Sequence, residues 1–151
     1  MSGQPMSELP RHSVSVTGVV LRSDGRVLAI KREDDGRWVP PGGVLELAET
    51  PQDGVVREVY EETGVKVRPT WLSGVYKNMR LGVVSLAFVC EVVGGEEHTS
   101  SEATRVCWLS PSDAVKAMPE ARAVRITDAL RADGPFVRVH DGNVILNGAD
   151  V

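Results

Sequence analysis

Apolar and polar positions in the first part of the chain follow the pattern of a β-hairpin. Residues 13–22 read SVSVTGVVLR, a valine-rich run with the spacing of a strand. Residues 23–26, SDGR, form a strong turn signal, and the run VLAIKR at 27–32 follows directly. These residues predict two antiparallel strands joined by a tight turn.

The pattern changes at residues 33–43, which read EDDGRWVPPGG. Pro40 and Pro41 lack amide donors, and the two glycines that follow permit unusual backbone angles. A strand or a helix is therefore not expected to continue here. The stretch predicts a shaped loop.

Residues 51–63 predict a helix whose start and end are both marked in the sequence. Thr50 has the side chain of an N-cap, Pro51 suits the first helical position, and Asp53 suits the positive end of the helix dipole. Gly64 is expected to end the helix. At about 3.6 residues per turn, one side of this helix gathers the residues expected to be buried, Val55, Val56, Val59, Tyr60 and Thr63.

The second half of the chain mixes strands with helices. The expected elements are strands at 69–78, 82–93 and 103–110, a short helix from Pro111, a longer helix at 120–133, and a terminal hairpin turning at Asp141-Gly142. No internal repeat, low-complexity segment or long linker divides the sequence. We therefore expect one layered α/β or α+β domain over residues 1–151, with a core at about 13–133 and a C-terminal extension at 134–151.

Composition narrows the class of protein. The 151 residues are 42% hydrophobic and 25% charged, as in an ordinary globular domain. The longest uncharged apolar run, residues 81–90, is far shorter than the roughly 20 residues that cross a bilayer, and residues 1–12 lack the pattern of a secretory signal. Cys90 and Cys107 form no C-x-x-C pair and are expected to be buried thiols. These features predict a cytoplasmic protein with no membrane partner.

The negative charge of the chain is concentrated in one segment. Residues 43–65 contain six acids and one base, a net charge of −5, whereas the whole chain has a net charge of −4. The rest of the chain is therefore close to +1. Acidity this local indicates a cation site rather than a generally acidic surface.

Three glutamates lie in the second half of the predicted helix. Glu58 and Glu62, four residues apart, line one border of the buried stripe, and Glu61 points more outward. The simplest interpretation is a solvated charged face, because glutamate is a good helix former. However, the helix dipole favours cations here, and Arg57 is the only adjacent base. At an effective dielectric near 20, two like charges about 4 Å apart repel by on the order of 4 kcal/mol, and a divalent ion would reverse that sign.

Carboxylate oxygens are the ligands that magnesium and manganese prefer. Magnesium typically takes few protein ligands and keeps positions for water and phosphate oxygens. The Pro-Pro-Gly-Gly turn can bring a backbone carbonyl, that of Gly42, to the same ion. The segment therefore predicts a metal site that serves phosphate chemistry.

The spacing of these residues resembles a known signature. Gly43, five residues, Glu49, seven residues and then REVYEETGV at 57–65 is similar to the Nudix box of the Nudix hydrolases. The resemblance implies an α/β/α sandwich with a mixed central sheet, and Mg²⁺ or Mn²⁺ as the cofactor. The positions that match metal ligands are Gly42, Glu58, Glu61 and Glu62, and those that match structural support are Gly43, Glu49, Arg57 and Gly64.

The same resemblance implies a metal-dependent pyrophosphohydrolase that cleaves a phosphoanhydride bond in a nucleoside diphosphate or triphosphate derivative. Glu61, Glu62 and Glu102 are the candidates for the catalytic base, the last because it precedes a strand that contains Trp108. A nucleoside triphosphate is slightly favoured as the substrate, since the domain is short and shows no additional N-terminal sheet. ADP-ribose or a nucleotide sugar is the alternative substrate, and a non-catalytic nucleotide sensor is the alternative function.

The remaining candidates carry weaker signals. Trp38, Tyr76 and Trp108 are expected to be core residues rather than stacking surfaces for a base. Arg122 and Arg125, in the late helix, could contact substrate phosphates or could equally be solvated. The three histidines show no ligand spacing. No basic stripe with interleaved aromatics is present, so a nucleic-acid partner is not expected. The oligomeric state is left open, with a homodimer as one option.

Overall fold

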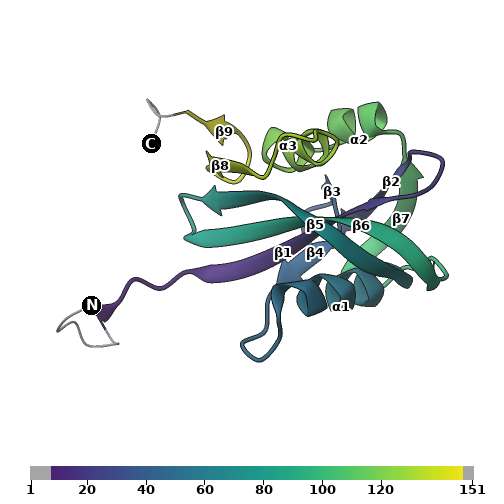
Figure 1. Ribbon diagram of the computed structural model, residues 1–151, viewed down its shortest axis with the longest axis horizontal. Helices are drawn as coiled ribbons and strands as arrows, with labels where there is room; N and C mark the ends of the chain where they lie inside the picture. The colour runs from purple at the N-terminus through teal and green to yellow at the C-terminus, as the bar shows by residue number, and fades with distance from the viewer. Residues whose placement is uncertain (1–7, 148–151) are drawn as a thin grey trace.

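The computed structural model describes residues 8–147, whose strands form one mixed sheet between helices. The strands are β1 Ser13–Leu21, β2 Val27–Arg32, β3 Trp38–Val39, β4 Gly42–Val44, β5 Val65–Asn78, β6 Val83–Gly95, β7 Ala103–Leu109, β8 Phe136–His140 and β9 Ile145–Leu146. The helices are α1 Pro51–Thr63, α2 Pro111–Ala117 and α3 Glu120–Ala129. Helix α1 lies on one face of the sheet, and α2 and α3 lie on the other (Figure 1). This arrangement confirms the expected α/β/α sandwich.

The sheet runs in the order β3-β2-β1-β6-β5-β8-β9, with β4 paired to β1 and β7 paired to β2. The pairs β1–β6 and β5–β8 are parallel, and the other pairs are antiparallel, so the sheet is mixed as expected. Strands β8 and β9 form the terminal hairpin predicted around Asp141-Gly142. Within residues 8–147, no helix is both long and apolar enough to cross a bilayer.

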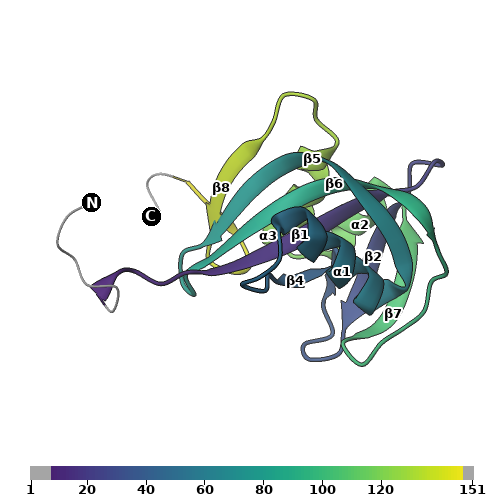
Figure 2. The same ribbon diagram turned by 60° about the horizontal axis from the view of Figure 1, so that its bottom comes forward.

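Side chains along β1 point alternately to the two faces of the sheet and contribute to a core layer on each face. Val16 and Val20 face α1 and pack with Val55 and Val59, all at most 1% exposed. Val19 points to the opposite face and belongs to a second cluster with residues of α2 and α3. Burial of each such side chain contributes roughly 1.5–3 kcal/mol. Helix α1 is therefore held firmly across β1 and beside β4 (Figure 2).

The main departure from the prediction is at residues 38–43, where the expected loop contains β3 and β4. Pro40 and Pro41 lie between these two strands, so their missing amide donors cost no ladder hydrogen bond. Gly42 pairs with β1, where a Cβ would lie 2.2 Å from a carbonyl oxygen of that strand. The glycine therefore permits a close strand pairing as well as a turn.

Other boundaries and exposures also differ from the prediction. Strand β5 begins at Val65 rather than at residue 69, because Pro69 stands at an irregularity in the pairing with β6 and does not stop the strand. Helix α3 ends at Ala129 rather than at residue 133, since Leu130 is 49% exposed and anchors no further turn. The predicted buried stripe of α1 is wrong at Tyr60, which is 46% exposed. Cys90 is buried as expected, whereas Cys107 is only partly buried.

One side of β1 pairs with two different strands, and the sheet opens between them. Near the end of β1, Leu21 pairs with Val27 of β2, whereas Ser15 and Thr17 pair with β4. Residues of both strands, of α1 and of α3 line a cavity of about 590 Å³ at this opening. The split of the sheet thus places side chains from all three layers around one space.

Candidate active site

Both ends of α1 are fixed in the way that the sequence predicts. Thr50 Oγ1 accepts a hydrogen bond from the Asp53 N–H at 3.1 Å. Gly64 ends the helix with φ 77°, and a Cβ at this position would lie 2.2 Å from a neighbouring carbonyl oxygen. With its ends set, the helix turns Glu58 and Glu62 toward the cavity, where they are 9% and 6% exposed.

Arg57 joins α1 to the loop before it. Its Nε donates to Glu49 Oε2 at 2.9 Å, and its Nη2 donates to the other Glu49 oxygen and to the Val44 carbonyl. Glu49 also accepts the Glu46 N–H at 2.9 Å. The guanidinium of Arg57 lowers the pKa of Glu49 to about 2, so this carboxylate is ionised at neutral pH. These contacts fit the supporting role expected for both residues.

Strand β4 brings its backbone against two carboxylates of α1. The Gly42 N–H donates to Glu62 Oε1 at 2.8 Å. A Cβ at Gly43 would lie 2.5 Å from Glu58 Oε2, so a residue with a side chain would displace this carboxylate. The two glycines therefore seat the acids of α1 against the strand. The metal contact expected through the Gly42 carbonyl stays a prediction.

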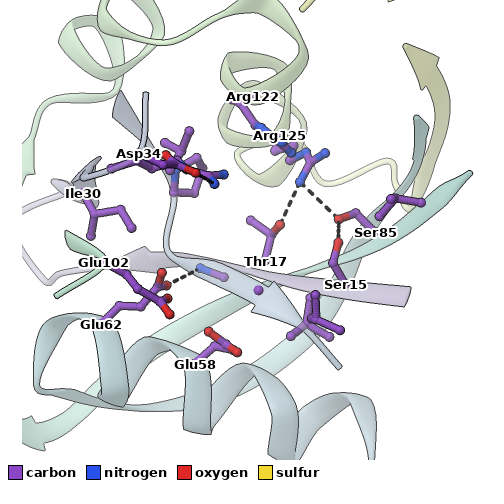
Figure 3. A pocket seen from close by; sticks show the side chains of 18 of the residues that line it. Ser15, Thr17, Ile30, Asp34, Glu58, Glu62, Ser85, Glu102, Arg122 and Arg125 are labelled. Carbon is purple, nitrogen blue, oxygen red and sulfur yellow. Dashed lines mark hydrogen bonds and ion pairs between the residues drawn. The ribbon is translucent and has the colours of Figure 1, made fainter. Parts of the chain in front are cut away.

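A third acid reaches the same wall from a distant part of the chain. Glu102 directly precedes β7 and lines the cavity together with Glu58 and Glu62. Its side chain lies beside that of Glu62, with Glu58 further along α1 (Figure 3). Burial raises the pKa of both helix residues, and the negative charge of Glu102 adds to this rise. Together these three residues, Glu58, Glu62 and Glu102, form what we call the acidic wall.

Burial makes the charges of two residues of the acidic wall, Glu58 and Glu62, costly. Desolvation raises the pKa of Glu62 to about 8, and the charges of Glu58 and Glu102 act in the same direction, while the Gly42 N–H opposes them. Burial also raises the pKa of Glu58, although its hydrogen bond from Arg57 opposes this rise. A bound cation would favour the ionised form of each carboxylate. Without one, Glu62 retains a proton near neutral pH.

The donor atoms of the acidic wall suit a hard divalent cation, because the described cavity lining contains carboxylates and no histidine or cysteine. The side chains do not form a closed ligand shell: among residues 8–147, no group of three or more His, Cys, Asp or Glu is arranged to hold a metal ion. Glu58 Oε1 and Glu61 Oε2 instead accept hydrogen bonds from Arg57 Nη1, at 2.8 and 3.2 Å. The donor set therefore fits Mg²⁺ or Mn²⁺ in chemistry, and closure around an ion requires these carboxylates to leave Arg57.

The predicted site residues fall into two groups in the structure. Those around the cavity are Gly42, Gly43, Glu58, Glu62 and Glu102. Glu49, Arg57 and Gly64 lie outside the lining and hold the loop and the helix in place. The side chain of Glu61 is 58% exposed, also outside the lining, in agreement with its expected outward direction.

The opposite wall of the cavity is basic, and the sequence left the role of its two arginines open. Arg122 and Arg125 of α3 line the cavity on the side away from the acidic wall (Figure 3). Arg125 is 2% exposed, so solvation of this side chain, one of the two options left open, is wrong. A signal was present: Arg125 lies four residues from Ala121 and four from Ala129, both buried, and so belongs to the core-facing side of α3.

The aromatic candidates do not line the cavity in the described part of the chain. Tyr76 is fully buried, and its hydroxyl donates to Asp128 Oδ2 at 2.8 Å. Trp38 and Trp108 pack against the two core clusters. The prediction of a core residue is confirmed for Tyr76, whereas Trp38 and Trp108 are only partly buried at the edge of the core.

Comparison with known sequences extends the resemblance beyond the box. The model of the NUDIX domain family matches residues 11–130. A MutT-like protein of Streptomyces ambofaciens is 54% identical over 143 residues, which cover 95% of this chain and 93% of that protein. An ADP-ribose pyrophosphatase of Methanocaldococcus jannaschii is 37% identical over 98 residues, which cover 60% of this chain and 57% of that protein.

Solved structures share the fold. A Nudix hydrolase from Nitrosomonas europaea superposes with a TM-score of 0.75 at 19% identity, covering 88% of this chain and 82% of that one. An ADP-ribose pyrophosphatase from Streptococcus suis superposes with a TM-score of 0.69 at 21% identity, covering 86% of this chain and 100% of that one. A third structure is a bifunctional NMN adenylyltransferase/ADP ribose pyrophosphatase from Francisella tularensis, solved with AMP and a manganese ion. It superposes with a TM-score of 0.63 at 20% identity, covering 82% of this chain and 42% of that one. Because the family model spans most of the sequence and the Streptomyces relative is alike along nearly its whole length, the chain belongs to the Nudix hydrolase family.

Proposed function

We propose that this Nudix hydrolase is a metal-dependent pyrophosphohydrolase that cleaves a phosphoanhydride bond in a nucleoside diphosphate or triphosphate derivative. The acidic wall carries the proposal, because three carboxylates share one side of a cavity and burial makes the charges of Glu58 and Glu62 unfavourable without a cation. Nudix hydrolases generally use divalent metal ions, and the carboxylate donors here suit Mg²⁺ or Mn²⁺.

The residues of the site take distinct roles in this proposal. Glu58 and Glu62 would hold the ion, with Glu61 as a third ligand once it leaves Arg57. When bound, the ion supplies neutralisation of phosphate charge and activation of water. Since Glu62 has a pKa of about 8, it must lose a proton for the ion to bind, and binding is expected to release that proton.

We assign the catalytic base to Glu102. Glu61 lies outside the cavity, and Glu62 is held by the Gly42 N–H at 2.8 Å. Glu102 lines the same cavity from an exposed position before β7, where its carboxylate can accept a proton from an attacking water.

A nucleoside triphosphate remains the slightly favoured substrate, with ADP-ribose or a nucleotide sugar as the alternative. The cavity of about 590 Å³ lies within the usual range of roughly 300–1,000 Å³ for small-molecule sites. The names of the two sequence relatives, MutT-like protein and ADP-ribose pyrophosphatase, support a nucleotide substrate without choosing between these options. We also propose the cytoplasm as the location, where Cys90 and Cys107 would stay reduced.

The test is a substrate panel of nucleoside triphosphates, ADP-ribose, nucleotide sugars and dinucleoside polyphosphates, with products identified by mass spectrometry. We expect turnover with Mg²⁺ or Mn²⁺ and none with EDTA. Glu62→Gln and Glu102→Gln should each lower kcat by at least about a hundredfold. Glu91→Gln is the matched control, since Glu91 pairs with Arg68 at the surface outside the cavity lining.

Two outcomes would contradict the proposal. Hydrolysis that persists in EDTA would exclude the metal requirement. Binding of nucleotides without turnover of any compound in the panel would instead support the non-catalytic sensor.

A further inference from the structure

The basic side of the cavity contains a polar cluster that the proposed chemistry does not use. Arg125 Nη1 donates to Thr17 Oγ1 at 2.8 Å and to Ser85 Oγ at 3.3 Å, and Nη2 lies 3.4 Å from His140 Nε2. Ser85 Oγ is in turn hydrogen-bonded to Ser15 Oγ. The Nε of Arg125 is buried and has no hydrogen-bond partner among the described residues.

No carboxylate of the described residues forms an ion pair with Arg125, and Asp35 acts on the neighbouring Arg122 only through its charge. The nearby acid Asp128 is engaged by Arg138, whose Nε and Nη2 donate to its two oxygens, each at 2.7 Å. Within residues 8–147, neither Arg122 nor Arg125 forms a salt bridge. The Tyr76 ring, 5.0 Å from the Arg125 guanidinium carbon, provides a cation–π contact. A buried cation without a counter-charge is costly, and it is retained where a bound anion can complete it.

The strand pairing places this cluster at a defined separation from the acidic wall. Thr17 pairs directly with Gly42, and the Gly42 N–H binds the Glu62 carboxylate. One strand pairing of about 5 Å plus one hydrogen bond on each side puts Glu62 and Arg125 on the order of 10 Å apart. A smaller cavity of about 100 Å³ continues beyond Arg125 toward Asn78. This separation is longer than the link between adjacent phosphates and is comparable with a sugar that carries groups at both ends.

We propose that Arg122, Arg125 and the hydroxyls of Thr17 and Ser85 form an anion subsite for a second phosphate, carried on the sugar of the nucleotide substrate. The inference rests on the proposed function, since the diphosphate at the acidic wall sets the position of the sugar. A guanidinium matches phosphate oxygens with its fork of donors, and the neighbouring hydroxyls add further donors. A neutral carbonyl of a base would leave the charge of Arg125 uncompensated, so the subsite selects an anion.

The first test is equilibrium binding with Mg²⁺ present, because the ion lets the acidic wall hold the diphosphate and so sets the position of the sugar. Each nucleotide carries a methylene bridge between its α- and β-phosphates, which prevents cleavage during the measurement. Isothermal titration calorimetry would compare ADP with ADP that carries an additional 2′- or 3′-phosphate. GDP would be compared with its own 2′- and 3′-phosphorylated forms, and inorganic phosphate would be titrated alone. We expect at least one position of the added phosphate to tighten binding to the wild-type protein by about tenfold in both base series. The proposal would be overturned if the added phosphate left the affinity unchanged in both base series, or if affinity differed only between adenine and guanine. It would also be overturned if free phosphate saturated the protein while the added phosphate gave no gain.

Variants assign the effect to the subsite. Arg122→Gln and Arg125→Lys should each reduce the gain from the added phosphate to less than about threefold, because the fork of donors is lost. Arg122 is only partly buried, so its variant supplies the test even where Arg125→Lys fails to fold. Arg131→Gln is the control, since Arg131 is exposed, lies just beyond α3 and pairs with Asp133. A gain that survives in Arg122→Gln, or that disappears in Arg131→Gln, contradicts the assignment.

Failure of this inference is distinguishable from failure of the proposed function. If the wild-type protein hydrolyses compounds of the panel but binds no more tightly when the phosphate is added, the proposed function is supported and the subsite is rejected. A protein that shows the gain, and loses it in the variants, but hydrolyses nothing retains the subsite as a binding site and loses the enzyme activity.

Discussion

Replacement of Glu62 by glutamine should stabilise the metal-free protein at high pH. Burial raises the pKa of Glu62 from its ordinary value of 4.5 to about 8 in the folded protein. A group with a raised folded pKa stabilises the fold below its unfolded pKa, and this stabilisation is lost as the pH rises toward the folded pKa. The free energy of unfolding of the wild-type protein should therefore fall between about pH 4.5 and 8. Glutamine cannot titrate and should not contribute to this fall.

The magnitude follows from the size of the pKa change. A difference between 4.5 and about 8 corresponds to at most about 5 kcal/mol at high pH. Relaxation of the side chain toward water in the cavity reduces this value, and we expect Glu62→Gln to be more stable than wild type by about 1–3 kcal/mol at pH 9. At pH 4.5 the difference should be much smaller. The amide oxygen of glutamine can still accept the Gly42 N–H, so the fold itself should not change.

The assay is urea denaturation in EDTA at several pH values, followed by circular dichroism. Glu61→Gln is the matched control on the same helix, because it makes the same chemical change at a side chain that is 58% exposed and lies outside the cavity. Added Mg²⁺ or Mn²⁺ should stabilise the wild type and reduce the advantage of Glu62→Gln. A stability difference that does not grow with pH, or one that is equally large for Glu61→Gln, would refute the reasoning.

Three further substitutions test the supporting structure. Gly43→Ala places a Cβ 2.5 Å from Glu58 Oε2, so steady-state kinetics should show kcat lowered by at least about tenfold with little change in melting temperature. Gly64→Ala, at φ 77°, should lower the free energy of unfolding in urea by about 1–3 kcal/mol, and an unchanged value would contradict the strain argument. Asp128→Asn weakens the paired contact with Arg138 and should cost about 2–4 kcal/mol in the same assay, whereas a loss under about 0.5 kcal/mol would show that the pair is not stabilising.

The helix of the acidic wall was accessible from sequence because its signals are local. The Thr50 cap, the Gly64 end and the four-residue spacing of Glu58 and Glu62 all act within a few turns, and the structure has each of them. The prediction of a loop at residues 38–43 was wrong, because β3 and β4 lie there. Proline and glycine indicate which backbone conformations are allowed, but not whether a neighbouring strand is close enough to pair.

By itself, the sequence determined the α1 helix, its row of carboxylates and the membership of the Nudix family, since these depend on residues close together in the chain. Only the tertiary structure decided that Glu102 stands beside Glu62 and that Arg125 is buried across the cavity from them. The period of a helix shows that a residue faces inward, but not what it meets there. What Arg125 meets depends on where β1 divides between β2 and β4, which is set by the packing of the whole sheet.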